Sequence, residues 1–205
     1  MIEVNNFEQI KNLIEFDGKS IYLVWLVLRN KDGNTKAKGN NRNRTIKSYY
    51  FQDLKHFEER EQEIIDICKM FNCRAYICLN NKPIENVLFE IQDNLTDRLR
   101  ELMHGQTIGI NGMLDHAVMK AGTDGDKRWI VDIDADESGL DEEMIKHIED
   151  DINTARSNFF KNVITRIPTA HGLHIVTYPF NTSDTKIGRD VKKAGLTLLY
   201  ANLNE

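Results

Sequence analysis

The sequence has few of the residues that mark secreted, disulfide-linked or membrane-spanning chains. It contains only three cysteines and three prolines in 205 residues. Cys68, Cys73 and Cys78 form no Cys-x-x-Cys motif with a His pair that could complete a tetrahedral zinc site. We therefore expect reduced, structural thiols in a cytoplasmic protein. The longest apolar run, residues 21–28, is too short to span a membrane, for which about 20 residues are needed.

The chain also lacks an excess of positive charge. Its 27 basic and 32 acidic residues give a net charge of -5, which excludes a uniformly basic nucleic-acid coat. One local exception is the segment 29–47, where seven basic residues less the charge of Asp32 give +6. Its Asn and Gly residues predict a loop. We expect this loop to bind a nucleic-acid backbone through Lys36, Lys38, Arg42 and Arg44, with a plain solvated hairpin loop as the alternative.

The spacing of apolar residues predicts an α+β fold. Residues 20–28 and 45–51 are expected to form a strand hairpin around the basic loop. The remaining expected strands are 74–79, 127–134, 162–167, 173–178 and 196–201, and the expected helices begin near residues 53, 83, 112 and 144. We expect residues 1–72 to form a small N-terminal α/β module. Residues 73–205 would form an RNA-recognition-like, split β-α-β antiparallel sheet, with both modules in one compact unit.

Two acids at the end of an apolar strand are the first candidate site. In the segment WIVDIDADE, Asp132 and Asp134 alternate with Val131 and Ile133, so the acids share one face of the strand. Two adjacent carboxylates repel each other and are expected to raise each other's pKa. They are also the ligands that Mg²⁺ or Mn²⁺ uses, together with substrate phosphates. The alternative is a strand that simply ends in solvent-facing acids.

A second motif, RIPTAHGLHIVTYPF, lies on a predicted hairpin. Its glycine, Gly172, would let the backbone approach a ligand closely. His174 follows at the start of a strand, where we expect it on the solvent-facing side of the sheet, together with Asp132 and Asp134. It could then bind a phosphate oxygen or transfer a proton. Arg166 and Thr169, just before this strand, are further candidates for phosphate binding.

Together, the two motifs resemble those of the archaeo-eukaryotic primase superfamily, which includes the primase-polymerases. That family has an apolar strand ending in Asp-x-Asp and then a small-x-His motif on a later strand. Here the matching residues are Asp132 and Asp134, then Gly172 and His174. The resemblance covers mainly residues 127–201. It implies metal binding by the acids, contact between His174 and nucleotide phosphates, and a minimal member of the kind that a phage might encode in a host cell.

The family's third acidic motif has no clear counterpart. The last predicted strand contains no Asp, so the third metal ligand would be Asp190 or, less favourably, Asp184, and the alternative is that the third carboxylate is absent. The resemblance thus implies a nucleotidyltransferase of primase-polymerase type that uses nucleoside triphosphates and a single-stranded nucleic-acid template. Two alternatives stay open. One is a non-catalytic nucleotide or single-stranded nucleic-acid binding protein, such as a phage accessory or anti-defence factor, and the other is a metal-dependent nuclease.

Overall fold

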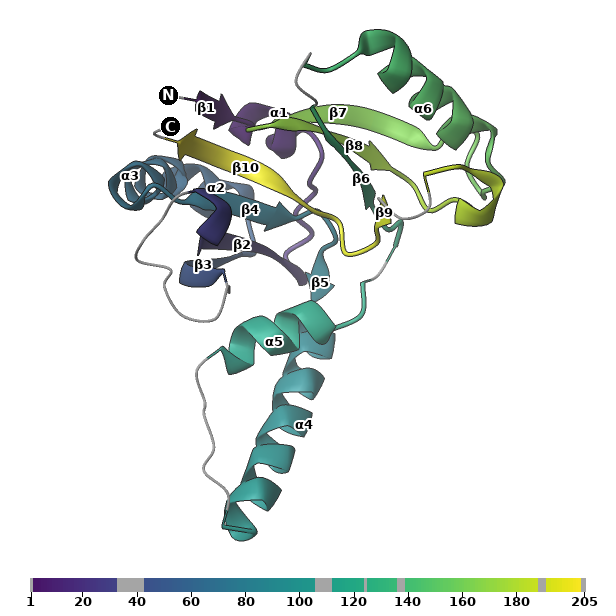
Figure 1. Ribbon diagram of the computed structural model, residues 1–205. Helices are drawn as coiled ribbons and strands as arrows, with labels where there is room; N and C mark the ends of the chain where they lie inside the picture. The colour runs from purple at the N-terminus through teal and green to yellow at the C-terminus, as the bar shows by residue number, and fades with distance from the viewer. Residues whose placement is uncertain are drawn as a thin grey trace.

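The computed structural model describes residues 2–32, 43–105, 112–123, 125–135, 139–187 and 191–203. It shows a mixed α+β protein built from antiparallel sheets and several helices (Figure 1). Within the described ranges, no helix is long and apolar enough to cross a membrane.

The first sheet combines strands from both ends of the chain. Its strand order is β1-β10-β4-β2-β3, and the short strand β5 also pairs with β2. The two chain ends therefore lie close together, because β1 and β10 pair along their length (Figure 1). The strands are β1 (Ile2–Asn5), β2 (Ser20–Leu28), β3 (Arg44–Phe51), β4 (Arg74–Cys78), β5 (Lys82–Pro83) and β10 (Leu196–Leu203).

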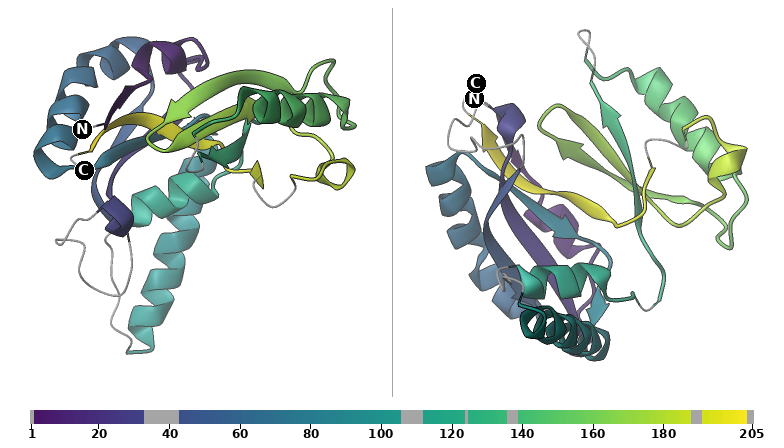
Figure 2. Two further views of the ribbon diagram at one scale, coloured as in Figure 1. Left: turned by 45° about the horizontal axis from the view of Figure 1, so that its top comes forward. Right: turned by 60° about the horizontal axis from the view of Figure 1, so that its bottom comes forward.

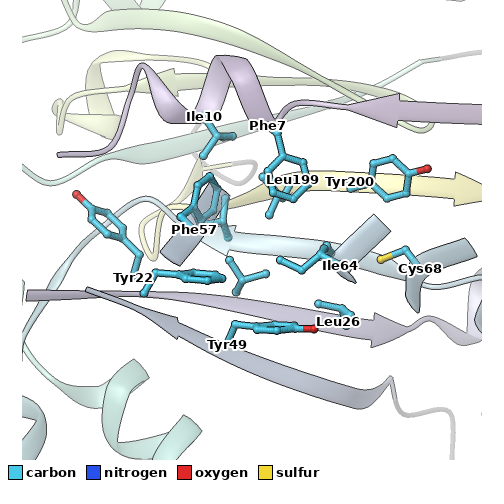
Figure 3. Close-up of a cluster of buried hydrophobic side chains, with 14 of the residues drawn as sticks. Phe7, Ile10, Tyr22, Leu26, Tyr49, Phe57, Ile64, Cys68, Leu199 and Tyr200 are labelled. Atoms are coloured by element: carbon cyan, nitrogen blue, oxygen red, sulfur yellow. The ribbon is translucent and has the colours of Figure 1, made fainter. Parts of the chain in front are cut away.

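Three helices cover one face of the first sheet and form the largest core with it. They are α1 (Phe7–Lys11), α2 (Leu54–Glu59) and α3 (Glu61–Phe71). Alternate residues of β2, such as Val24 and Leu26, face this core because strand side chains alternate between faces. Aromatic side chains fill its centre, as Figure 3 shows: Phe7, Tyr22, Tyr49, Phe57 and Tyr200. The three cysteines are buried and free, as the sequence predicts.

The second sheet has the strand order β7-β8-β6-β9. Helix α6 (Glu142–Thr154) covers its outer face (Figure 2), where Ile145 and Ile152 pack against Val131 and Ile175. This core explains why the apolar residues of β6 alternate with acids: one set faces α6 and the other faces away from it. The strands are β6 (Trp129–Asp134), β7 (Val163–Thr169), β8 (Gly172–Thr177) and β9 (Val191–Lys192).

Two further helices form an arm that projects from the body (Figure 1). Helix α4 (Ile84–Met103) buries only Val87 among its described side chains, and α5 (Met113–Lys120) packs beside its first half. Lys82 anchors the base of the arm, since its buried ammonium donates to the carbonyl oxygen of Ala121 at 2.7 Å. Short 3-10 turns occur at Asn30–Asp32 and Thr182–Asp184.

Buried asparagines join the two sheets. The side-chain nitrogen of Asn6 donates to the carbonyl oxygens of Pro168 on β7, at 3.0 Å, and Leu198 on β10, at 2.9 Å. Asn80 forms a paired hydrogen bond with the backbone N–H and carbonyl of Arg128, just before β6. Buried amides must find partners to offset their lost hydration. These bonds therefore fix the position of one sheet against the other.

The structure confirms the α+β class and both predicted hairpins, β2–β3 and β7–β8. It corrects the expected division at residues 72 and 73. Residues 73–205 do not form one sheet of their own, because β4 and β10 belong to the first sheet. The apolar pattern identified these strands but held no information about which sheet each one joins.

We predict that Gly172→Ala destabilises the protein. A Cβ on Gly172 would overlap the backbone carbonyl oxygen of Ile133, so β6 and β8 would have to separate. Overpacking of this kind costs roughly 1–3 kcal/mol. Urea unfolding should show that loss for Gly172→Ala. In Gly122→Ala, where the new Cβ would meet Asn86 at a comfortable 3.7 Å, stability should be unchanged. Equal midpoints for both variants would contradict this explanation.

Candidate active site

The strand register brings the two sequence motifs together. Asp132 pairs with His174, and Asp134 pairs with Gly172, across the antiparallel β6–β8 ladder. Direct partners in a ladder share a face, so both acids and the imidazole lie on the same side of the second sheet. This confirms the expected placement of the three side chains on neighbouring strands. Their roles in catalysis stay predictions.

The shared face borders a cleft of about 760 Å³ between the two sheets. Asp132, Asp134, His174 and Lys192 line it from the second sheet, with Thr169 and His171 beside them. The first sheet supplies the opposite wall, formed by Trp25, Val27, Arg29, Thr45, Arg74, Tyr76, Leu196 and Leu198, together with Asp32 and Asn43. The cleft therefore has an acidic wall and a wall with aromatic and guanidinium groups.

His174 is the most buried polar side chain of the acidic wall, with 7% of its side chain exposed. The expectation that it faces solvent is wrong, because this side of β8 packs toward the first sheet. Its Nε2 lies 3.1 Å from Asp132 Oδ1, and its Nδ1 lies 2.8 Å from the hydroxyl of Thr197 on β10. Both ring nitrogens thus have protein partners, so contact with a phosphate would require breaking one of these bonds.

Asp132 also accepts a hydrogen bond from Lys192 on β9, through its other oxygen Oδ2. The hydrogen bond from His174 and the ammonium of Lys192 lower the pKa of Asp132 well below its usual range, although burial opposes the shift. The expectation that repulsion between the two acids raises that pKa is wrong, because each oxygen of Asp132 has a donor of its own. Asp134 is exposed at the end of β6.

The opposite wall contains a fully buried ion pair. The guanidinium of Arg74 donates to both carboxylate oxygens of Asp32, at 2.8 Å and 2.6 Å, and each side chain is 4% exposed. Arg29 donates to the hydroxyl of Tyr76 at 3.3 Å. Among the described residues, Arg29 has no carboxylate partner. It is therefore the cleft cation best placed to bind an external anion.

Two sequence candidates for phosphate binding have other roles in the structure. Arg166 points to the α6 side of the second sheet, where its guanidinium binds Glu149 at 2.6 Å and Glu142 at 2.8 Å. Arg166 pairs with Ile175, the residue that follows His174 on β8. Successive side chains of a strand face opposite sides of the sheet, so Arg166 faces away from the cleft. Gly172 allows close approach of the β6 backbone rather than of a ligand. Thr169 does line the cleft.

The basic loop is only partly within the described residues. Lys36, Lys38 and Arg42 lie outside them, as does Asp190, the favoured third acid. Arg44 is exposed at the start of β3. Asp184, the other candidate, binds Arg156 through both oxygens at 2.8 Å, and Arg156 follows α6 on the outer side of the second sheet. Asp184 is therefore not a ligand of the cleft.

The residues of the acidic wall fit a divalent cation only in part. Within the described segments, no three His, Cys, Asp or Glu side chains converge closely enough to hold a metal ion by themselves. Mg²⁺, however, usually keeps several waters and binds through one or two carboxylates plus substrate phosphates. Asp132 and Asp134 on one face can supply that smaller set. The pair suits an ion that arrives with a phosphorylated ligand.

Several residues of the site were not identified from the sequence. Lys192 lies on the short strand β9, which the apolar pattern did not predict. Thr197, the buried partner of His174, lies on a strand whose pairing could not be known, and Arg74 begins an apolar strand without any motif around it. Arg29 was counted only as part of the basic loop. The single available signal was alternation: Thr197 interrupts the apolar residues of β10 at a position where it must be buried and hydrogen-bonded.

Comparison with known proteins does not identify the chain. No protein-family model, curated protein or solved structure matches it. The resemblance to the primase superfamily therefore depends on the two short motifs and on the geometry described above.

We predict that Asp132→Asn is destabilising at pH 7, whereas Asp134→Asn is nearly neutral. Asn keeps the shape of Asp132 but removes the charge that both His174 and Lys192 contact. Hydrogen bonds to charged groups contribute about 1.5–3 kcal/mol, so urea unfolding should show a loss of that size. Asp134→Asn is the matched control because it neutralises the neighbouring acid at an exposed position. Equal losses in both variants would contradict the assigned contacts.

The stability difference between wild type and Asp132→Asn should depend on pH. The pKa of Asp132 is lowered in the folded state. Its contribution to stability is therefore fully present above the unfolded-state pKa of about 3.9 and is lost as the pH falls toward the folded-state pKa. The difference in unfolding free energy between wild type and Asp132→Asn should shrink as the pH falls below about pH 4.

Proposed function

We propose that this protein is a metal-dependent nucleotidyltransferase of primase-polymerase type, acting on nucleoside triphosphates and a nucleic-acid template. The observation that supports it most directly is the convergence of Asp132, Asp134 and His174 on one cleft between two sheets. Unrelated strand-end acids would have no reason to share a face with the histidine of the second motif and to border a cavity large enough for a nucleotide.

The proposed fold supports the same assignment. Strands β6 and β7 are both antiparallel to β8, which lies between them, and helix α6 connects β6 to β7. That arrangement is consistent with a split β-α-β unit, the element expected of an RNA-recognition-like module. We infer that β6–β9 with α6 form this module, smaller than residues 73–205.

Each cleft residue has a role in the proposed reaction. Asp132 and Asp134 would hold Mg²⁺ or Mn²⁺, which when bound activates a 3′-hydroxyl and stabilises the leaving pyrophosphate. His174 acts as a positioning residue, since its ring is fixed by Thr197 and orients the Asp132 carboxylate. Arg29 and Thr169 are placed to bind phosphate oxygens. Trp25 and Tyr76, direct partners across β2 and β4, offer ring faces to a base.

One observation favours a second candidate, a nucleotide or single-stranded nucleic-acid binding protein without turnover. Among the described residues, three carboxylates line the cleft. Asp132 and Asp134 form no ion pair with an arginine, whereas Asp32 is bound to Arg74. A third free acid would be expected of a polymerase of this type. Its absence from the described cleft would leave ligand binding intact while limiting catalysis.

A direct assay separates the candidates. The protein is incubated with primed and unprimed single-stranded DNA and RNA, labelled nucleoside triphosphates, and Mg²⁺ or Mn²⁺. We expect template-dependent incorporation of nucleotides, which Asp132→Asn with Asp134→Asn should abolish. In thermal melts, excess Mn²⁺ should raise the melting temperature of the wild type and not of the double variant, because a ligand that binds the native state stabilises it.

The other outcomes are equally informative. Retention of the template without incorporation would favour the binding protein. Shortening of the template would favour a metal-dependent nuclease. Incorporation that survives in the double variant would contradict the assignment of the acids.

We predict a contribution of the basic loop to nucleic-acid affinity. Replacing Lys36, Lys38, Arg42 and Arg44 by Ala should weaken binding of a labelled single strand and flatten its salt dependence, because fewer counterions are released on binding. Stability should change little, since surface charges seldom contribute more than about 0.5 kcal/mol each. Polarisation at several salt concentrations measures this.

A matched control replaces Lys55, Arg100, Lys146 and Lys161, which are exposed elsewhere on the surface. Equal losses of affinity in the two variants would mean that only net charge matters and that the loop is not a binding element.

A further inference from the structure

The two partners of Asp132 differ in how firmly the protein holds them. His174 is 7% exposed, and its far nitrogen is bound to the fully buried Thr197. Lys192 is 54% exposed and approaches from the open side of the cleft. Its side chain is a flexible chain that ends in a compact, strongly hydrated charge. The imidazole is therefore a fixed partner, whereas the ammonium can leave at little cost.

The position of Lys192 follows from the β6–β9 pairing. Lys192 is the direct partner of Ile130, which shares a face with Asp132, so the lysine side chain must enter the cleft next to the acids. The neighbouring Lys193 points to the other side, where its ammonium lies 4.8 Å from the centre of the Trp129 ring. Of these two adjacent lysines, only Lys192 reaches a carboxylate of the candidate site.

The ammonium of Lys192 occupies the place that a metal ion would need. It contacts Oδ2, the oxygen of Asp132 that His174 leaves open. A metal ion bound to that oxygen would lie close to the ammonium and would be repelled by it. Metal binding at Asp132 is therefore weakened while Lys192 is there and favours its displacement.

We propose that Lys192 is an internal counter-ion of Asp132. A divalent cation displaces the lysine from Asp132, and the lysine then binds the phosphate oxygens of the incoming ligand. This inference rests on the proposed function, because it assumes that the acids bind a metal ion. It adds a residue that neither sequence motif contains. It also makes a distinctive claim: the same side chain opposes binding of the metal alone and favours binding of the metal–nucleotide complex.

The first half of the claim is tested by titrating Mn²⁺ into the full-length protein. Electron paramagnetic resonance measures the free ion directly, so no activity is needed. Lys192→Met, which removes the charge but keeps an unbranched chain, should bind Mn²⁺ about twofold to fivefold more tightly than wild type, the range expected for breaking a partly exposed ion pair. Lys192→Arg should not gain affinity, because a guanidinium can also pair with Asp132.

The matched control is Lys193→Met, which removes an equal charge one residue away. If a lower net charge were enough to attract Mn²⁺, both methionine variants would gain affinity equally. That result would overturn the proposal, as would equal Mn²⁺ affinity of Lys192→Met and wild type.

The second half is tested by calorimetric titration of ATP at saturating Mg²⁺. Lys192→Met should bind Mg²⁺–ATP about tenfold more weakly than wild type, because a charge-assisted bond to phosphate is lost. Lys193→Met should bind it normally. Unchanged ATP affinity in Lys192→Met would overturn the transfer of the lysine to the phosphates.

These results also separate failure of this inference from failure of the proposed function. If wild type and Lys193→Met bind Mn²⁺ and lose that binding with Asp132→Asn, the metal site stands, whatever Lys192 does. If none of the variants binds Mn²⁺, with or without ATP, both the metal site and the role of Lys192 are excluded. Tighter Mn²⁺ and weaker ATP binding in Lys192→Met alone is the result expected here.

Discussion

The hydrogen bond between His174 and Thr197 is the contact on which the candidate site depends. It joins β8 of the second sheet to β10 of the first, and it lies in the buried interface between them. Because the imidazole uses its other nitrogen to bind Asp132, the same ring that connects the sheets also orients the carboxylate. The geometry of the acidic wall is thus set by the packing of the two sheets. Any change that moves β10 against β8 must also move Asp132.

Charge compensation is the second constraint on the cleft. On one wall Asp132 has a histidine and a lysine as partners, and on the other wall Arg74 is neutralised by Asp32. The Arg74–Asp32 pair is fully enclosed, so removing either member would leave an uncompensated buried charge. The contacts of Asp132 are more exposed on the lysine side. The cleft therefore combines an enclosed ion pair with a more exposed one, and we propose that only the second is exchanged for a ligand.

The sequence was sufficient for most elements of the fold and for the centre of the site, but not for the short strands β1, β5 and β9 or for the arrangement of the sheets. Alternation along β6 and β8 placed Asp132, Asp134 and His174 on one face, which needs only the period of a strand. It could not show that β4 and β10 would pair with β2 and β1, because strand pairing across long stretches of chain leaves no local pattern. Arg166 and Gly172 were misassigned for the same reason. The outward turn of Arg166 depends on register, and the need for glycine at position 172 comes from the carbonyl of Ile133 on another strand.

The composition of the described cleft has a consequence for how metal and nucleotide would bind. Two carboxylates, of which Asp132 is already partly neutralised by Lys192, would give weak affinity for a bare divalent ion, since each further ligand must come from water or from a phosphate. A triphosphate supplies those ligands and also receives the displaced ammonium. Each ligand would therefore increase the affinity for the other, and by the same factor, as thermodynamic linkage requires. In such a site, phosphate oxygens would supply part of what a third acid supplies in the primase family, and Lys192 would balance the charge of Asp132 until the ligand binds.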